Sequence, residues 1–199
     1  MKSFKQHILE KLKVRERNTT KHTLFPETKN ELKQMIKDEI SKNGNECSLN
    51  HIDVSKITDM SGLFYKSKFN GDISSWNVLN VTDMCAMFYE SKFNGDISDW
   101  DVSNVTDMHR MFQNSDFNGD ISNWDVSNVT DMEGMFYGSY FKGDLSKWDV
   151  SNVKNMFSMF NRSVFSGDLS YWDVSNVRNM EYMFINSPLE NNPPKWYKE

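Results

Sequence analysis

The chain has 199 residues, of which 14% are aromatic and 26% charged, and its formal net charge is −5. The aromatic content argues against a disordered chain, and the length favours one elongated domain over two separate cores. Residues 1–50 carry eleven Lys or Arg against seven Asp or Glu, whereas residues 51–199 carry twelve against twenty-one. The acidic part of the chain therefore argues against binding to nucleic-acid phosphates as its main task.

The first fifty residues predict two helices. A capping box at residues 3–6 begins a short apolar stripe at helical spacing, and a second capping box at residues 28–31 begins a longer one that Gly44 ends. Because stacked repeats expose apolar faces at their ends, we expect the second helix to cover the first repeat. The first helix has two interpretations, either part of this cap or a detachable segment that docks in a partner's groove.

Signals for export or membrane insertion are not found in the sequence. The N-terminal residues are charged throughout, without the apolar run of a signal peptide, and no segment approaches the ~20 apolar residues of a membrane span. Cys47 and Cys85 are too few for a disulfide scaffold and are typical of a reducing compartment. We therefore expect a cytoplasmic protein with no membrane partner.

A 24-residue unit repeats from residue 51 onward. Tryptophan marks this period at Trp76, Trp100, Trp124, Trp148, Trp172 and Trp196. The full unit follows the pattern F-x-G-D-[IL]-S-x-W-[DN]-V-x-N-V-x-[DN]-M-x-x-M-F-x-x-S-x. A unit of this size cannot bury its own apolar residues, so neighbouring units must stack. We assign residues 1–50 to an N-terminal helical segment and cap, residues 51–187 to the repeat body, and residues 188–199 to a C-terminal cap.

The apolar spacing within one unit predicts a strand followed by a short helix. Ile97, Trp100 and Val102 have the spacing of a leucine-rich-repeat strand. Apolar residues then continue from Val105 and Met108 at helical spacing, with the methionines expected in the core. The predicted fold class is therefore an α/β solenoid, a leucine-rich-repeat-like stack of strand–turn–short helix units with a helical N-terminal cap.

The repeat also resembles a known family. The string F-N-G-D-I-S-N-W-D-V-S-N-V-T-D-M, from Phe117 to Met132, closely resembles the repeats of BspA-like leucine-rich-repeat surface proteins. This resemblance covers residues 51–187 and implies a right-handed solenoid with a role in adhesion or protein binding. Residues 1–12 resemble leaders of phage-encoded members of this repeat group, which implies a phage- or mobile-element-encoded protein.

Two columns of acidic residues recur in the unit, represented by Asp96 and Asp101. In stacked strands ~4.8 Å apart, these like charges need compensation. Calcium could supply it, as could hydrogen bonds from the turn that follows each aspartate. The unit lacks the second Gly-x-Asp of calcium-binding β-rolls, and the uncharged Asn77 stands in one of the columns. We therefore expect local hydrogen bonds and no metal site.

The sequence contains no recognisable catalytic motif. The four histidines are off-register from one another, and none has metal-ligand spacing to a cysteine or to a second histidine. No glycine-rich loop is suited to hold a phosphate. We expect a protein that is not an enzyme, with no catalytic residues and no cofactor.

Residues that vary on a constant scaffold indicate a partner-binding surface. The candidate partner-binding residues are Asp99, Asn123, Lys147, Tyr171, Phe157 and Tyr182. The first four form a row between the constant Ser and Trp of each unit and are the preferred site, whereas the last two lie on the predicted helix. The predicted function is a monomeric, intracellular, non-enzymatic repeat scaffold that binds or inhibits a host protein. The alternative is an adhesin-like or structural repeat protein of a cell or virion surface.

Overall fold

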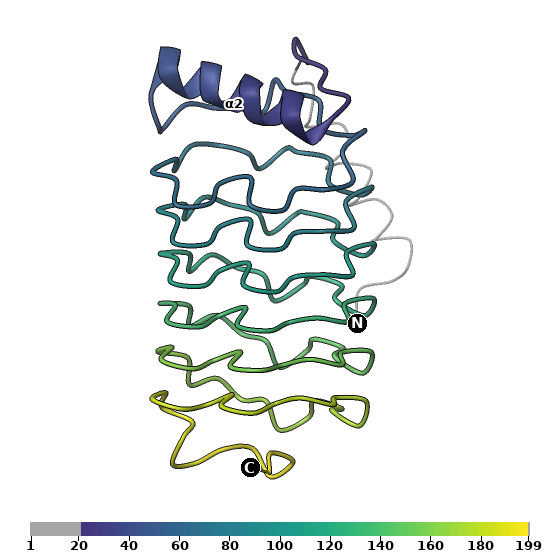
Figure 1. Ribbon diagram of the computed structural model, residues 1–199, viewed down its shortest axis with the longest axis vertical. Helices are drawn as coiled ribbons and strands as arrows, with labels where there is room; N and C mark the ends of the chain where they lie inside the picture. The colour runs from purple at the N-terminus through teal and green to yellow at the C-terminus, as the bar shows by residue number, and fades with distance from the viewer. Residues whose placement is uncertain (1–20, 199) are drawn as a thin grey trace, which may run out of the picture.

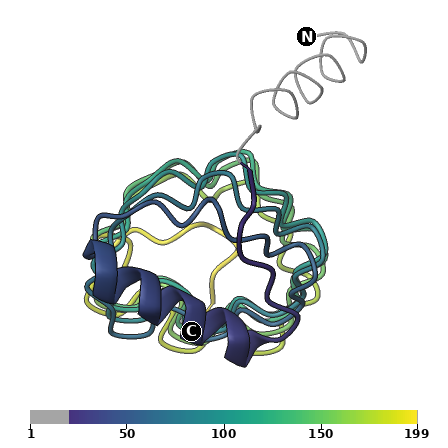
Figure 2. The ribbon, with the colours of Figure 1, turned by 90° about the horizontal axis from the view of Figure 1, so that it is seen from above.

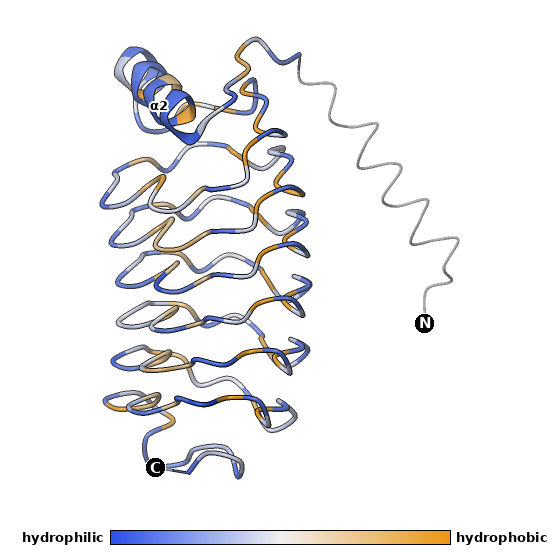
Figure 3. Cartoon of the chain, turned by 45° about the vertical axis from the view of Figure 1, so that its right-hand side comes forward, coloured by the Kyte–Doolittle hydropathy of each residue, from blue (hydrophilic) through white to orange (hydrophobic). Residues whose placement is uncertain are grey.

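The computed structural model describes residues 21–198, which form a stack of coils closed at one end by a helix (Figure 1). Each 24-residue unit makes one circuit of the stack, and the view along the stack shows successive coils superimposed (Figure 2). Hydrophobic segments recur at corresponding places in successive coils (Figure 3). Residues 24 apart in the sequence are consequently neighbours in adjacent coils.

Helix α2, Lys29–Asn43, covers the first coil of the stack (Figure 1). It begins with a capping box, in which the Thr28 hydroxyl accepts from the Glu31 backbone N–H and the Glu31 carboxylate accepts from the Thr28 N–H. Leu32 and Ile36 are buried in the same core as the coils. The second helix expected from the sequence is thus confirmed, whereas the first falls within residues 1–20, outside the described residues.

The core of the stack consists of ladders of equivalent side chains. One ladder contains Phe64, Phe88, Phe112, Phe136, Phe160 and Phe184, with ring centroids 5.6–6.0 Å apart. A second ladder contains Phe69, Phe93, Phe117, Phe141 and Phe165. The methionines of the repeat are buried beside them as expected, except that Met180 in the last coil is partly exposed.

Each tryptophan connects its own coil to the preceding one. The Trp124 side chain is 4% exposed, and its indole Nε1–H donates to the carbonyl of Ile97 at 3.1 Å. The same bond is made by Trp76, Trp100, Trp148, Trp172 and Trp196. A large apolar surface is therefore buried without leaving the indole donor unpaired.

The backbone of each coil is a succession of tight turns. The N–H groups of Trp100, Val105 and Met111 each donate to the carbonyl three residues earlier. In the turn that ends at Met111, φ is positive at its third residue, Arg110 (56°). It is also positive at Asn114 (52°), the third residue of the next turn, in which the Ser115 N–H donates to the Phe112 carbonyl.

Alternate N–H groups of the same segment join neighbouring coils. Those of residues 108, 110, 112 and 114 donate to the carbonyls of residues 131, 133, 135 and 137 at 2.7–3.0 Å. Backbone groups that a helix would pair within itself are thus paired between coils.

The predicted α/β solenoid of strand–turn–short helix units is wrong. Within residues 21–198, α2 is the only helix, and strand pairing is limited to isolated parallel bridges such as Asp107 with Asp131. The misleading signal is the spacing of three between apolar residues. A β-turn brings residues i and i+3 together, as one turn of a helix does. The segment from Ile97 to Trp100 is likewise a turn and not a strand.

Residues 188–198 close the other end of the stack incompletely. Trp196 stacks on Trp172 with centroids 6.3 Å apart, and Tyr197 packs edge-on against Phe184 at 4.9 Å. Both Trp196 and Tyr197 remain partly exposed. Among the described residues, no helix has the length and apolar character needed to cross a membrane.

Candidate functional site

The preferred row of candidate residues lies on a surface that we call the acidic face. It comprises residues 72–77, 96–101, 120–125, 144–149 and 168–173. The structure places Asp99, Asn123, Lys147 and Tyr171 at equivalent positions of successive coils, and all four are exposed. Tyr171 is 86% exposed and therefore buries little of its ring against the protein.

Carboxylates of the acidic face are held by their own turns. Asp96 Oδ1 accepts from the backbone N–H of Ser98 at 3.0 Å and from its hydroxyl at 2.7 Å. Asp101 accepts the equivalent pair of bonds at 3.3 and 2.6 Å. The pKa values of Asp120 and Asp144 lie below the usual value because the backbone N–H and then the hydroxyl of the following serine stabilise the charged form. The local hydrogen bonds expected from the sequence are confirmed.

The other two candidate residues lie on a separate surface, the turn face, which comprises residues 85–90, 109–114, 133–138, 157–162 and 181–186. The rings of Phe157 and Tyr182 meet edge to face, with centroids 5.5 Å apart. Tyr182 is 51% exposed, whereas Phe157 is half-buried rather than fully exposed. The structure therefore brings these two residues together and separates them from the row on the acidic face.

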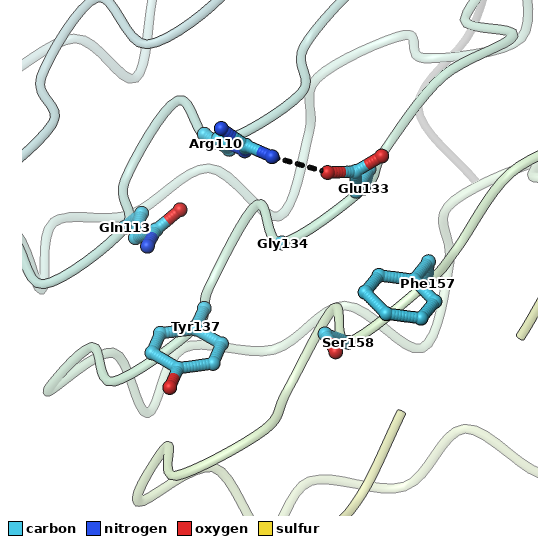
Figure 4. Close-up of a pocket in the computed structure, with 7 residues that line it drawn as sticks. All are labelled: Arg110, Gln113, Glu133, Gly134, Tyr137, Phe157 and Ser158. Carbon is cyan, nitrogen blue, oxygen red and sulfur yellow. Dashed lines mark hydrogen bonds and ion pairs between the residues drawn. The ribbon is translucent and has the colours of Figure 1, made fainter. Parts of the chain in front are cut away.

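A pocket of about 250 Å³ opens on the turn face beside Phe157 (Figure 4). Its lining consists of Arg110, Gln113, Glu133, Gly134, Tyr137, Phe157 and Ser158. Gly134 has no side chain at the position that Arg110 and Ser158 occupy in the adjacent coils, which leaves the space open. Sequence analysis missed this pocket, because a glycine becomes informative there only when the coils are compared position by position.

An ion pair forms one side of this pocket. Arg110 Nη2 donates to Glu133 Oε1 at 2.6 Å, and the Asn155 amide donates to Glu133 Oε2 at 3.3 Å. Burial alone would raise the pKa of Glu133, but the hydrogen bonds from Arg110 and Asn155 outweigh it and lower that pKa. The carboxylate is therefore charged at neutral pH and fully engaged with its neighbours.

A thiol and an imidazole of the turn face also meet the carboxylate of Asp107, which adjoins that face. His109 Nε2 lies 2.8 Å from Cys85 Sγ, and His109 Nδ1 lies 2.7 Å from Asp107 Oδ1. Sequence analysis missed this cluster, although Cys85 and His109 are one repeat apart and could have been paired by that spacing. The order of groups is that of an activated cysteine nucleophile.

The surroundings of this cluster do not favour a reactive thiolate. Burial, followed by the charges of Asp107 and Asp83, raises the pKa of Cys85 to about 11. The backbone N–H of Cys85 donates to Asp83 Oδ1 at 2.8 Å, and that of Ala86 donates to the His109 carbonyl at 2.9 Å. Neither donor is thus free to stabilise an oxyanion. Among residues 21–198, no group of three or more His, Cys, Asp or Glu side chains is arranged to hold a metal ion.

Comparison with known proteins gives one family match. A family model described as "Mycoplasma protein of unknown function, DUF285" matches residues 30–140 and, in a second alignment, residues 113–197. Together the two matches span α2 and the coils that follow it. No curated protein and no solved structure matches the chain.

Proposed function

Because this chain belongs to the DUF285 family, a repeat family of unknown function, we propose its function from its surface, as a non-enzymatic protein-binding scaffold. The observation that supports this proposal is the contrast between interior and exterior. Ladders of Phe, Trp and Met run through the core of the stack, whereas exposed positions change from coil to coil. A constant stack that displays changing side chains is how repeat proteins distinguish their partners.

The turn face of the later coils is the better candidate for the contact surface. Tyr137 and Phe157 line a pocket there, and Tyr182 packs against Phe157. Aromatic residues at pockets are frequent hot spots of interfaces. On the acidic face, Tyr171 lies among recurring carboxylates. These carboxylates already accept hydrogen bonds from the serines of their own turns. We therefore propose Phe157 and Tyr182 as the main contacts, in place of the row preferred from sequence.

The finer proposal is that the partner is a host protein, which a phage- or mobile-element-encoded chain binds or inhibits inside the cell. It is supported only by the resemblance of residues 1–12 to phage-encoded leaders. We propose that the chain is a monomer, because one stack already presents the whole turn face. Sedimentation analysis of the purified chain tests the proposed oligomeric state.

The test of the proposed surface compares two double variants by affinity capture from the native host. Phe157→Ala with Tyr182→Ala should lose the captured protein, whereas Tyr171→Ala with Lys147→Ala should retain it. Both pairs change exposed or half-buried residues, so equal melting temperatures confirm that folding is intact. Loss of capture only in the variant with Tyr171→Ala and Lys147→Ala would place the contact on the acidic face. Failure of the unaltered chain to capture any protein specifically would reject the scaffold proposal.

The alternative proposal is an adhesin-like or structural protein of a cell or virion surface. It is supported by the resemblance of residues 117–132 to repeats of BspA-like surface proteins. Protease treatment of intact native cells separates the two proposals, because an intracellular protein is protected while a displayed one is cleaved. Cleavage that matches that of a known surface protein would favour the alternative.

A further inference from the structure

We infer that the pocket at Gly134 receives one neutral aromatic side chain of the partner protein. The inference rests on the proposed protein-binding function and specifies the chemistry that the turn face recognises. It follows from three properties of the pocket, namely its origin, its walls and its charge.

The pocket exists because one coil lacks a side chain at a position where others have one. Residues 86, 110, 134, 158 and 182 are equivalent, and all have positive φ between 50° and 59°. A Cβ added at Gly134 would lie 3.5 Å from Arg110 Cγ and 3.5 Å from Gln113 Oε1, which is ordinary contact. Positive φ favours glycine here, but the four equivalent residues carry side chains at the same φ, and a Cβ at position 134 has room. The fold therefore tolerates a side chain at this position, and the open volume results from its absence in this one coil.

The size and walls of the pocket suit a single ring. Its volume of about 250 Å³ is below the range of about 300–1,000 Å³ typical of pockets for whole small molecules. Tyr137 and Phe157 supply aromatic walls in Figure 4. Phe157 is fixed from outside by the edge-to-face contact with Tyr182. An entering ring can therefore pair with aromatic groups that already have a defined orientation.

The charge at the pocket selects against a charged occupant. Arg110 and Glu133 already neutralise each other at 2.6 Å, and the second oxygen of Glu133 accepts from Asn155. A Lys or Asp side chain entering the pocket would be desolvated without finding an unpaired opposite charge. The guanidinium of Arg110, in contrast, can attract the negative face of a neutral ring.

The direct test uses N-acetyl-tryptophanamide, N-acetyl-leucinamide and N-acetyl-lysinamide as probes of the full chain. Binding is followed by NMR shifts of the backbone amides of Gly134 and Ser158. We expect the tryptophan amide to bind about threefold to tenfold more tightly than the leucine amide, the factor expected from one aromatic contact. The lysine amide should be the weakest of the three. Equal binding of all three probes, or no shift at either amide, overturns the inference.

A matched pair of variants locates the binding. Gly134→Gln fills the pocket with an uncharged side chain, and Ala86→Gln makes the same change at the equivalent position of an earlier coil. We expect Gly134→Gln to abolish the shifts caused by the tryptophan amide and Ala86→Gln to retain them. Ala86→Gln should melt close to the unaltered chain, whereas Gly134→Gln should melt somewhat lower but remain folded, because its positive φ strains any side chain. Retained binding in a folded Gly134→Gln, or loss in a folded Ala86→Gln, overturns the assignment to this pocket.

A further variant tests the aromatic wall and separates this inference from the proposed function. Phe157→Leu keeps an apolar side chain but removes one of the two rings, so the preference for the tryptophan amide over the leucine amide should decrease, with Tyr137 and Arg110 still in place. A preserved preference overturns the role given to Phe157. If the probes bind as expected but the chain captures no protein from its host, only the proposed function fails. If capture depends on Phe157 and Tyr182 but the probes do not bind, only the pocket inference fails.

Discussion

Trp124 illustrates how one side chain stabilises two coils. Its ring is buried, and its indole donates to Ile97 of the preceding coil. We predict that Trp124→Ala lowers the free energy of unfolding by ~3–5 kcal/mol, as expected when a large buried side chain is truncated. Urea titration measures the change. Trp124→Phe, which keeps most of the apolar volume but loses the indole donor, should be less destabilising. A loss below about 1 kcal/mol for Trp124→Ala would contradict its place in the core.

The raised pKa of Cys85 predicts a slow reaction of its thiol with iodoacetamide. Because that pKa is about 11, the thiol is neutral at pH 8, and the alkylation rate should rise about tenfold per pH unit up to the pKa. Removing one nearby charge with Asp107→Asn should lower the pKa and accelerate alkylation. The rates are measured by mass spectrometry in a Cys47→Ser background. Asp131→Asn, one coil farther away, is the control, and equal acceleration there would contradict the electrostatic explanation.

Aspartates of the acidic face predict a loss of stability in acid. The pKa values of Asp149 and Asp173 lie below the usual value because the following serine binds the charged form, first through its hydroxyl at Asp149 and first through its backbone N–H at Asp173. A carboxylate whose pKa is lowered by folding stabilises the fold above its unfolded pKa, and this contribution disappears as pH falls through the folded value. Asn77 occupies the same column and accepts an equivalent backbone bond at 3.3 Å.

The variant that tests this effect is therefore Asp149→Asn with Asp173→Asn. Its melting temperature should fall less between pH 6 and pH 3 than that of the unaltered chain, because two of the titrating groups are gone. Scanning calorimetry at several pH values measures the difference. Parallel curves for the two proteins would show that the carboxylates contribute no acid-dependent stability.

Among the structural elements, the junction between the N-terminal cap and the first coil is the most tightly constrained. A Cβ at Gly71 would lie 1.9 Å from the carbonyl oxygen of Cys47, a backbone atom, whereas one at Gly119 would lie 2.9 Å from a ring carbon of Phe117. We predict that Gly71→Ala is the more destabilising, at about 1–3 kcal/mol or more, because backbone cannot rotate away as a side chain can. Denaturant unfolding of the two variants compares them, and equal losses would contradict a special constraint at the cap.

Sequence could predict the elements that depend on local chemistry. The beginning of α2 was recognisable because Thr28 and Glu31 satisfy each other's backbone N–H groups. The coils were not recognisable as turns, because apolar residues three apart suit both a helix and a β-turn. The difference is decided by the N–H groups of residues such as Met108 and Arg110, which pair with the next coil instead of within a helix. Whether these N–H groups bond within their own unit or to the next one depends on how two units pack. The sequence of a single unit therefore does not show it.

The candidate site was only partly predictable for the same reason. Phe157 and Tyr182 were selected as variable aromatic residues, but their contact depends on how adjacent coils superimpose. The meeting of Cys85 with His109 depends on the same superposition. The pocket at Gly134 depends on an absent side chain, which no motif describes. Period alone identifies which residues are equivalent, whereas the packing of coils decides which of them meet.

For the molecule as a whole, the hydrogen bonds of the acidic face predict that calcium does not change the stability of the fold. Its aspartates already accept hydrogen bonds from their own turns, as Asp96 does from Ser98. Binding an ion would have to replace bonds that are already made, so millimolar Ca²⁺ should leave the melting temperature unchanged. Thermal melts with added calcium and with chelator measure this. A rise of several degrees that chelator reverses would show a calcium site and ligand-linked stability.

The equivalence of successive coils has a consequence for how such a repeat protein can evolve. In the middle of the stack, the bonds that a coil makes to the coil before it are those that it offers to the coil after it, as the tryptophan ladder shows. Recombination that adds or removes one 24-residue segment in register therefore joins ends that already match. The exposed residues of that segment move with it as a block. A gene of this kind can revise what its product recognises by reordering whole blocks, without a new core having to evolve.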